Sequence, residues 1–258
     1  MVRVADVITI DAPVLSAGLK SFGLMAHFDF VVCNKDTMPV FAVEFDGPCH
    51  AKPEQMVRDR KKDALCDICG LPLLRINSRY LSEPGTGMTV LTWLVGAWFL
   101  EHSFYQAQVE GFVPLDEPFD PWFVNLSWKT ERYPFWLSRE FLSRVRRLNA
   151  EGFCPCPGVN VVVAEDHDNV LRAFAFVELS GGVAVCAKSA MKHQAFPRHH
   201  LAQILEETVL LNLDRETDEV LAGKRATPTS QAADVFSRYS NELRLIQSMS
   251  SSGPRNCL

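Results

Sequence analysis

The sequence predicts a mixed α/β protein, and three observations in its first third lead to that prediction. Residues 28–32 and 40–45 are short β-type runs separated by a polar segment that suits a hairpin. From Pro53 onward apolar residues recur at helical spacing until Gly70 ends the run. Residues 71–76 then form a third apolar run. The order β-β-α-β indicates a compact mixed sheet with a helix on it.

The segments on either side of this core have weaker patterns. Residues 1–10 alternate valine and isoleucine with polar neighbours, which is typical of a strand, and residues 14–22 suit a short helix. Residues 77–87 contain Pro-Gly-Thr-Gly and predict a loop. The aromatic run 88–104 predicts a helix that packs on the sheet.

A second, α+β region is expected after this helix. Residues 109–134 are too rich in proline for a long regular element, so we place the domain boundary between residues 105 and 106. The region 106–258 is expected to contain a basic helix, a three-stranded meander and two further helices. These elements are predicted at residues 138–149, then 159–164, 170–178 and 183–189, then 201–222 and 232–249.

Acidic residues lie inside the first two apolar strands, at Asp29, Glu44 and Asp46. Burying a carboxylate costs several kcal/mol unless it is hydrogen-bonded, paired or bound to a metal. Side chains at i and i+2 share a strand face, so Glu44 and Asp46 point the same way and Asp29 can join them from the neighbouring strand. Three carboxylates meeting in this way favour a hard divalent cation, Mg²⁺ or Mn²⁺.

The helix after Pro53 carries its own polar stripe. Asp59, Lys62, Asp63 and Cys66 follow at i, i+3, i+4 and i+7, so Lys62 projects between two acids and can face the carboxylates. The adjacent Arg60 and Lys61 remain alternatives for any role that needs a cation, and a solvated helix face is the plainer interpretation of all three.

These residues together resemble the PD-(D/E)XK nuclease superfamily. The resemblance is carried by Asp29, by the block Glu-Phe-Asp-Gly-Pro-Cys-His at 44–50, by Asp59 with Lys62, and by Gly-Leu-Pro-Leu-Leu-Arg-Ile at 70–76. It is closest to the branch with a Glu-x-Asp-Gly-x-x-His block, related to very-short-patch-repair endonucleases and to an uncharacterised bacterial domain family. It covers about residues 1–85 and implies a restriction-endonuclease-like core.

The resemblance also implies roles for individual residues. Asp29 and Glu44 would bind the metal, with Asp46 beside them and the Phe45 carbonyl as a third ligand. The superfamily commonly places a lysine two residues after the glutamate, but this chain has Asp46 there, so Lys62 would supply that cation.

Three further residues match the family, and one segment departs from it. His50 would be a general base or a phosphate contact, and Asp59 and Arg75 would support the site. The family usually has a substantial helix before the first strand, often bearing an acid, whereas residues 14–22 are short and contain none.

The implied function is that of a Mg²⁺-dependent endonuclease acting on nucleic acid, expected to be DNA. The alternative is an inactive nuclease-like binding or docking subunit of a larger defence or repair complex. The net charge of −5 does not itself predict nucleic-acid binding, so any attraction must come from local patches. The weak candidates for such patches are Arg58, Arg60, Lys61, Arg144, Arg146 and Arg147.

Cysteine usage and hydropathy predict a cytoplasmic protein in a reducing compartment. The eight cysteines are scattered, no signal segment opens the chain, and the apolar run 88–100 is too short to cross a bilayer, so no membrane is expected as a partner. Two short cysteine motifs could bind zinc: Cys66-x-x-Cys69, and Cys154-Pro-Cys156 together with Cys186 or His193. For both motifs, thiols without a metal are the preferred interpretation. The aromatic C-terminal half is the expected surface for a protein partner or a second copy.

Overall fold

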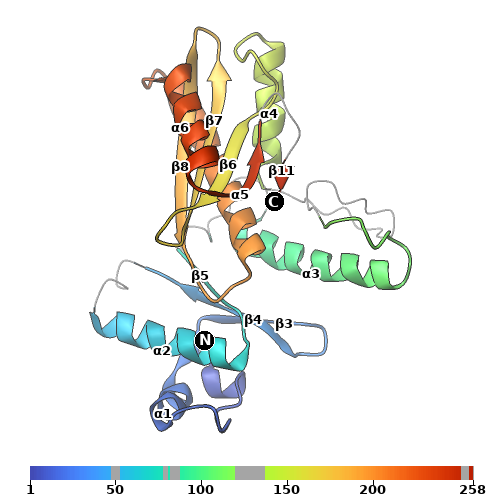
Figure 1. Ribbon diagram of the computed structural model, residues 1–258, viewed down its shortest axis with the longest axis vertical. Coiled ribbons are helices and arrows are strands. Elements are labelled where there is room, and N and C mark those ends of the chain that lie inside the picture. The colour runs from blue at the N-terminus through green and yellow to red at the C-terminus, as the bar shows by residue number, and fades with distance from the viewer. Residues whose placement is uncertain (48–52, 78–80, 82–87, 120–136, 251–255, 258) are drawn as a thin grey trace. The chain divides into compact units, whose positions relative to one another are not determined.

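The computed structural model describes residues 1–47, 53–77, 81, 88–119, 137–250 and 256–257. It confirms a mixed α/β protein, and the chain divides into two compact units (Figure 1). The first unit comprises residues 1–82 with 194–198, and the second comprises residues 83–193 with 199–258. This division lies earlier than the predicted boundary at 105/106, which falls inside helix α3 (Val90–Val109). Helix α3 therefore belongs to the second unit.

The first unit contains a three-stranded sheet in the order β3-β4-β5. Strands β3 (Phe30–Cys33) and β4 (Pro39–Phe45) form the expected antiparallel hairpin, and β5 (Leu73–Ile76) lies parallel to β4. The Asn34 side chain closes the hairpin turn because its Oδ1 accepts the backbone N–H groups of Asp36 and Met38. The predicted β-β-α-β order is confirmed.

Helix α2 (Pro53–Cys69) covers one face of this sheet. Its buried Leu65 and Cys66 pack in one cluster with Ala42 of β4 and Leu73 of β5. The helix ends at Gly70, whose φ of +68° is readily adopted only by a residue without a Cβ. The second helix of this unit, α1 (Ala17–Met25), begins at Ser16, whose hydroxyl accepts the N–H of Leu19.

The strand expected at residues 1–10 is almost entirely absent. Only β1 (Val2–Arg3) is extended, paired antiparallel with β2 (His27–Phe28), and the chain then enters the 3-10 helix η1 (Val4–Asp6). The alternating apolar residues instead lie in a turn. Val4 and Ile8 are both buried there, and the Ile8 N–H donates to the Val4 carbonyl.

Residues 194–198 complete the first unit from far along the sequence. The ring of Phe196 meets the ring of Phe41 edge-on at 5.4 Å, on the sheet face opposite α2. The Leu73 N–H donates to the Ala195 carbonyl, so this segment also lies along the outer edge of β5. No sequence pattern near residue 194 indicates this pairing.

The second unit is built on a six-stranded sheet in the order β11-β10-β6-β7-β8-β9. The predicted meander is confirmed as its centre, in β6 (Asn160–Glu165), β7 (Val170–Leu179) and β8 (Val183–Lys192). The outer strands come from segments for which no strand was predicted, namely β9 (Thr227–Pro228), β10 (Arg244–Met249) and β11 (Asn256–Cys257).

Helices lie on both faces of this sheet (Figure 1). Helix α6 (Thr229–Glu242) packs Phe236 and Tyr239 against Phe176 and Phe174 of β7. Helix α5 (Arg198–Leu221) bonds to residues of the opposite face, as when the Asn212 amide donates to Ser189 Oγ at 2.9 Å. Helix α4 (Arg139–Ala150) is the predicted basic helix.

The helix predicted at 232–249 is wrong in its last third, because α6 ends at Glu242 and β10 follows. The structure contains no described helix that is long and apolar enough to span a membrane.

Candidate active site

The candidate site of the first unit lies where β4 and β5 meet helix α2. The parallel register of β4 and β5 pairs Glu44 with Arg75. Glu44 and Asp46 each form an ion pair with a cation of α2 or β5. Lys62 Nζ on α2 lies 2.7 Å from Glu44 Oε2, and Arg75 Nη1 on β5 lies 3.4 Å from Asp46 Oδ1. Each of these two acids therefore has a cation beside it.

Glu44 is the most deeply buried acid of this site, with 4% of its surface exposed. Burial raises the pKa of its carboxyl group, and the hydrogen bond from Lys62 partly offsets that rise. Its second oxygen, Oε1, is buried and has no hydrogen-bond partner among the residues that the structure describes. A buried carboxylate oxygen without a partner is costly, so this atom calls for a proton or a cation.

Asp29 lies at the bend between β2 and β3, next to Glu44. Its Oδ2 accepts the backbone N–H of Phe45 at 3.0 Å, which holds the carboxylate at the end of β4. The charge of Asp29 also raises the pKa of Glu44, which places the two carboxylates within electrostatic reach of each other. The ligand role expected of the Phe45 carbonyl stays a prediction.

The third expected carboxylate is arranged differently. Within the described ranges, Asp29, Glu44 and Asp46 do not bring three oxygens within 4.8 Å of one another. Asp46 is instead 40% exposed and lies beside the Arg75 guanidinium. The predicted cluster of three acids is thus a pair, Asp29 and Glu44. Asp46 instead contacts Arg75, which the prediction from the strand pattern did not include.

Lys62 is the cation that the fold brings to the acid pair. Its side chain is 10% exposed, and its Nζ donates to the His27 carbonyl at 2.7 Å as well as bonding Glu44. The same nitrogen lies 5.7 Å from the centroid of the Phe28 ring. The alternatives Arg60 and Lys61 are both exposed. The prediction from helical spacing, that Lys62 and not Arg60 or Lys61 faces the site, is therefore consistent with the burial of these three side chains.

Arg75 gathers the remaining acids of the site. Its Nη2 lies 2.9 Å from Asp63 Oδ1 and its Nη1 lies 3.4 Å from Asp59 Oδ1. Burial alone would lower the pKa of this guanidinium, but the acids around it outweigh burial and raise the pKa. Burial raises the pKa of Asp63, and Arg75 opposes that rise. Asp59 and Arg75, the two expected supporting residues, thus lie in one ion-pair network that also includes Asp63.

One contributor to this site has no signal in the local sequence. The Gln194 side chain accepts the Arg75 backbone N–H at 2.5 Å and donates to the Arg75 carbonyl at 3.3 Å. It therefore fixes the strand that carries the guanidinium. A separation of 119 residues explains why no spacing rule could find it.

His50 lies outside the described residues, so its expected role as a base or phosphate contact stays a prediction. The weak phosphate candidates divide into two groups. Arg58, Arg60 and Lys61 on α2, and Arg146 and Arg147 on α4, are exposed. Arg144 instead bonds Asp214 at 2.8 Å and Asp218 at 2.5 Å, so its charge joins α4 to α5.

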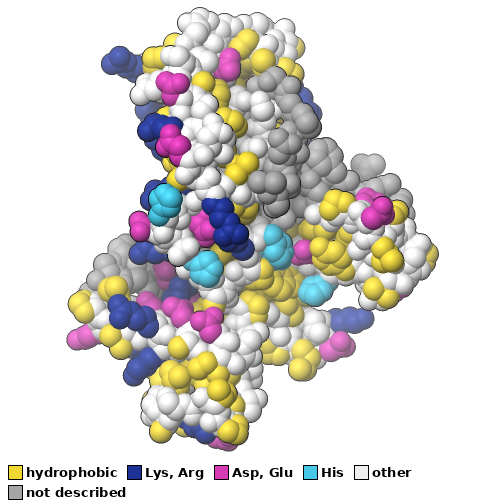
Figure 2. All heavy atoms as spheres, viewed as in Figure 1, with side chains coloured by type: hydrophobic (Ala, Val, Ile, Leu, Met, Phe, Trp, Pro, Cys, Tyr) yellow, Lys and Arg dark blue, Asp and Glu magenta, His cyan; other side chains and the backbone are white. Residues whose placement is uncertain are grey.

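The visible surface in Figure 2 intermingles acidic and basic side chains. This distribution agrees with the net charge of −5 and gives no general attraction to a polyanion.

The surroundings of the two cysteine pairs, Cys66 with Cys69 and Cys154 with Cys156, are compatible with thiols that bind no metal. Cys66 is buried, and burial raises the pKa of its thiol to about 12, while Cys69 is partly exposed. Burial, and to a lesser extent the neighbouring Cys156, raises the pKa of Cys154. In the described part of the chain, neither pair belongs to a three-residue cluster that could hold a metal.

Comparison with known proteins adds one finding. Residues 1–86 match the model of a protein family described as "Protein of unknown function (DUF2726)". The match includes the elements of the first unit from β1 to β5 and ends at residue 86, so residues 194–198 of that unit and the rest of the chain are unmatched. No curated protein and no solved structure matches the chain.

Proposed function

We propose that the first unit is a metal-dependent nuclease that hydrolyses phosphodiester bonds of nucleic acid, with DNA as the expected substrate. The proposal rests on the PD-(D/E)XK-like residue pattern and on one observation above the others. Glu44 buries a carboxylate whose Oε2 bonds to a lysine and whose Oε1 has no hydrogen-bond partner among the described residues. Asp29 lies close enough to raise the pKa of that carboxyl group.

The donor set suits a hard divalent cation. Asp29 and Glu44 offer carboxylate oxygens, and Mg²⁺ typically takes one or two protein carboxylates and completes its shell with water and phosphate. Asp29 and Glu44 would hold the ion, which would polarise the phosphate and supply a nucleophilic water at neutral pH. A cation would also compensate the partnerless Oε1 of Glu44.

The residues around this pair have separable roles in the proposal. Lys62 orients Glu44 and places a positive charge next to it, where negative charge develops on the phosphate. Arg75 holds Asp46, Asp59 and Asp63 and so fixes β5 against α2. Arg58, Arg60 and Lys61 are exposed on the same helix and can attract the substrate backbone.

The test is a cleavage assay with conservative variants. Purified full-length protein is incubated with supercoiled plasmid and with single-stranded oligonucleotide, in Mg²⁺ or in Mn²⁺. We expect nicking or fragmentation by wild type and loss of at least about 100-fold in rate for Glu44→Gln and Asp29→Asn, since each removes a metal-binding charge. The amide oxygen introduced by Asp29→Asn can still accept the Phe45 N–H, so that variant should fold.

Asp36→Asn is the matched control, because Asp36 is an exposed acid in the hairpin turn of the same sheet. It should cleave at the wild-type rate. Activity that survives both Glu44→Gln and Asp29→Asn, or a wild type that cleaves neither substrate with either metal, would contradict the proposal.

A second candidate is a nuclease-like module that binds without cleaving, and one observation favours it. Lys62 neutralises Glu44, and Arg75 interacts with Asp46, Asp59 and Asp63, so most acids of the site already have a cation inside the protein. Calorimetric titration with Mg²⁺ and Mn²⁺ separates the two candidates. Heat of binding that disappears in Glu44→Gln supports the nuclease, and its absence in wild type supports the inactive module.

A further inference from the structure

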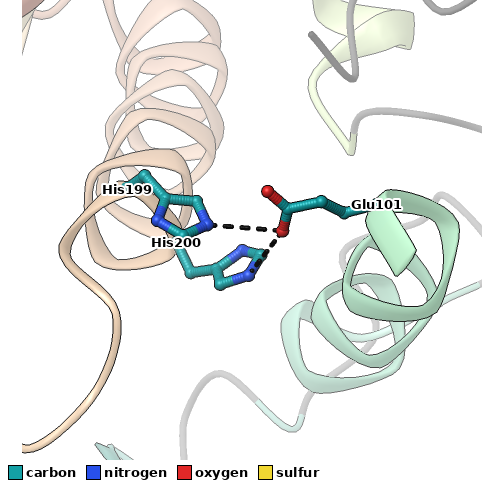
Figure 3. A group of neighbouring side chains, drawn as sticks. All are labelled: Glu101, His199 and His200. Atoms are coloured by element: carbon teal, nitrogen blue, oxygen red, sulfur yellow. Dashed lines mark hydrogen bonds and ion pairs between the residues drawn. The ribbon is translucent and has the colours of Figure 1, made fainter. Parts of the chain in front are cut away.

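A second cluster of ligand-type side chains lies wholly within the second unit. Glu101 projects from α3, and His199 and His200 project from the first turn of α5, with all three side chains converging (Figure 3). His200 Nε2 lies 2.9 Å from Glu101 Oε2, and His199 Nε2 lies 3.3 Å from the same oxygen. No spacing pattern indicated this cluster, because Glu101 precedes His199 by 98 residues.

The spacing of these three atoms matches what a transition metal requires. All three lie within 4.8 Å of one another. Nitrogen and oxygen ligands about 2.0–2.1 Å from a tetrahedral Zn²⁺ are roughly 3.3 Å apart. The two measured separations are close to that value, so an ion needs only a small outward movement of the side chains.

The surroundings of His200 resemble the support that metal-binding histidines usually have. His200 is 2% exposed, and its ring stacks on Trp98 with centroids 4.7 Å apart. Its Nδ1 lies 3.4 Å from Gln203 Oε1, to which an Nδ1–H can donate. With the proton on Nδ1, the Nε2 lone pair is directed at Glu101, and this is the tautomer that a metal ligand needs.

The space between these groups suits either a proton or a metal ion. In one tautomer an Nε2–H donates to the Glu101 carboxylate, and in the other the Nε2 lone pair can bind a metal together with that carboxylate. A metal ion satisfies both histidines and the carboxylate at once.

We propose that Glu101, His199 and His200 form a mononuclear site for a divalent transition-metal ion, with Zn²⁺ as the expected occupant. Two imidazoles and one carboxylate favour Zn²⁺ and its neighbours in the first row over Mg²⁺. Three protein ligands leave at least one coordination position for water or another small ligand. The His199 side chain is 55% exposed, so that position is open to solvent. This site is separate from the one proposed in the first unit.

The test uses the full chain after chelator treatment and dialysis. Titration of the Glu44→Gln variant, which lacks a ligand of the site proposed in the first unit, with Co²⁺, followed by visible absorption, and with Zn²⁺, followed by calorimetry, should each give one site per chain. The Co²⁺ spectrum should lack thiolate charge-transfer absorption, because no cysteine is a ligand. Co²⁺ bound with that absorption would place the metal on cysteines and overturn the proposal, and so would the absence of binding.

Two variants and a matched control make the assignment residue-specific. His199→Ala should weaken Zn²⁺ binding by more than Gln203→Ala, which removes only the support and should cost about 10-fold. His199 is exposed, so its replacement should leave the fold intact. His167→Ala removes an exposed histidine from a turn of the same unit and should bind as wild type does. Equal affinity of wild type and His199→Ala would rule the site out.

Discussion

The charge of Lys62 stabilises the fold because it compensates the buried carboxylate of Glu44. Its ammonium group is buried against Glu44 and the His27 carbonyl, so removing it leaves a buried carboxylate without its cation. We expect Lys62→Met to lower the free energy of unfolding by about 3 kcal/mol, as is usual when one partner of a buried pair is deleted. Urea unfolding followed by circular dichroism measures this loss.

Arg60→Met supplies the comparison for Lys62→Met, since Arg60 occupies the exposed side of the same helix. Its unfolding free energy should stay within about 0.5 kcal/mol of wild type. Similar losses in the two variants would mean that the Lys62–Glu44 pair contributes nothing specific.

The residues of this pair also show how far local sequence rules extend. Two-residue alternation predicted that Glu44 of β4 and Asp46, just beyond its end, point the same way, and helical spacing correctly directed Lys62 inward. The rules did not reveal that Arg75 would draw Asp46 away from Asp29 and Glu44. That outcome depends on the parallel register of β4 and β5, which pairs Glu44 with Arg75 and which no local pattern specifies.

Among the elements, β5 depends on a side chain for the outer hydrogen bonds of Arg75. An edge strand exposes unpaired N–H and C=O groups, and Gln194 satisfies both groups of Arg75 with one amide. We expect Gln194→Ala to destabilise the first unit by about 1–3 kcal/mol, because these backbone groups lose their partner. Hydrogen exchange of the peptide covering residues 73–76 should be faster than in wild type.

Gln106→Ala is a suitable control for this prediction, because the Gln106 side chain is exposed and bonds only to Glu110 among the partners seen for it. Exchange in residues 73–76 should be unchanged in that variant. Protection of β5 that is equal in Gln194→Ala and wild type would show that Ala195 and Phe196 hold the edge unaided.

Strand β10 shows where element prediction fails. Residues 232–249 have an amphipathic pattern that favours one helix, yet the chain leaves the helix after Glu242. Arg244–Met249 then pairs antiparallel with β6, and Leu245 joins the core cluster beneath α6. Pairing with a strand about 80 residues earlier in the sequence is a tertiary effect, and it overrides the local helical preference. The central strands were predictable because each carries its own alternation and turn.

At the scale of the whole molecule, the two units differ in what can be inferred about them. In the first unit the β-β-α-β order and the β3–β4 hairpin were predictable because these elements follow one another along the chain, whereas the β1–β2 pairing, the parallel β4–β5 pairing and the contribution of 194–198 were not. The second unit assembles its sheet from segments between residues 160 and 257, so only the contiguous meander was predictable. The two proposed metal sites follow the same division, because one lies in adjacent elements and the other joins α3 to α5.

The core of the second unit makes the stability of the protein depend on pH. Glu207 of α5 is 2% exposed, its Oε2 accepts the Ser138 N–H at 2.8 Å, and its Oε1 lies 3.3 Å from the Ser138 hydroxyl. Burial, with a smaller contribution from the neighbouring Glu206, raises the pKa of Glu207 from 4.5 to about 8, despite these bonds. The carboxyl group is therefore protonated in the folded chain at pH values where it ionises in the unfolded chain.

The sign of the effect follows from proton binding. Between about pH 4.5 and pH 8 the unfolded chain holds fewer protons at this residue than the folded chain, so folding stability from Glu207 is complete below that range and declines as pH rises through it. Glu207→Gln removes the titration while keeping an oxygen for Ser138. We expect the unfolding free energy of wild type, relative to Glu207→Gln, to fall steadily across this range in urea unfolding at several pH values.

The control is Glu151→Gln, at an exposed position, whose unfolding free energy should change with pH in parallel with that of wild type. If Glu207→Gln also runs parallel to wild type, the buried carboxyl group does not titrate as its surroundings require.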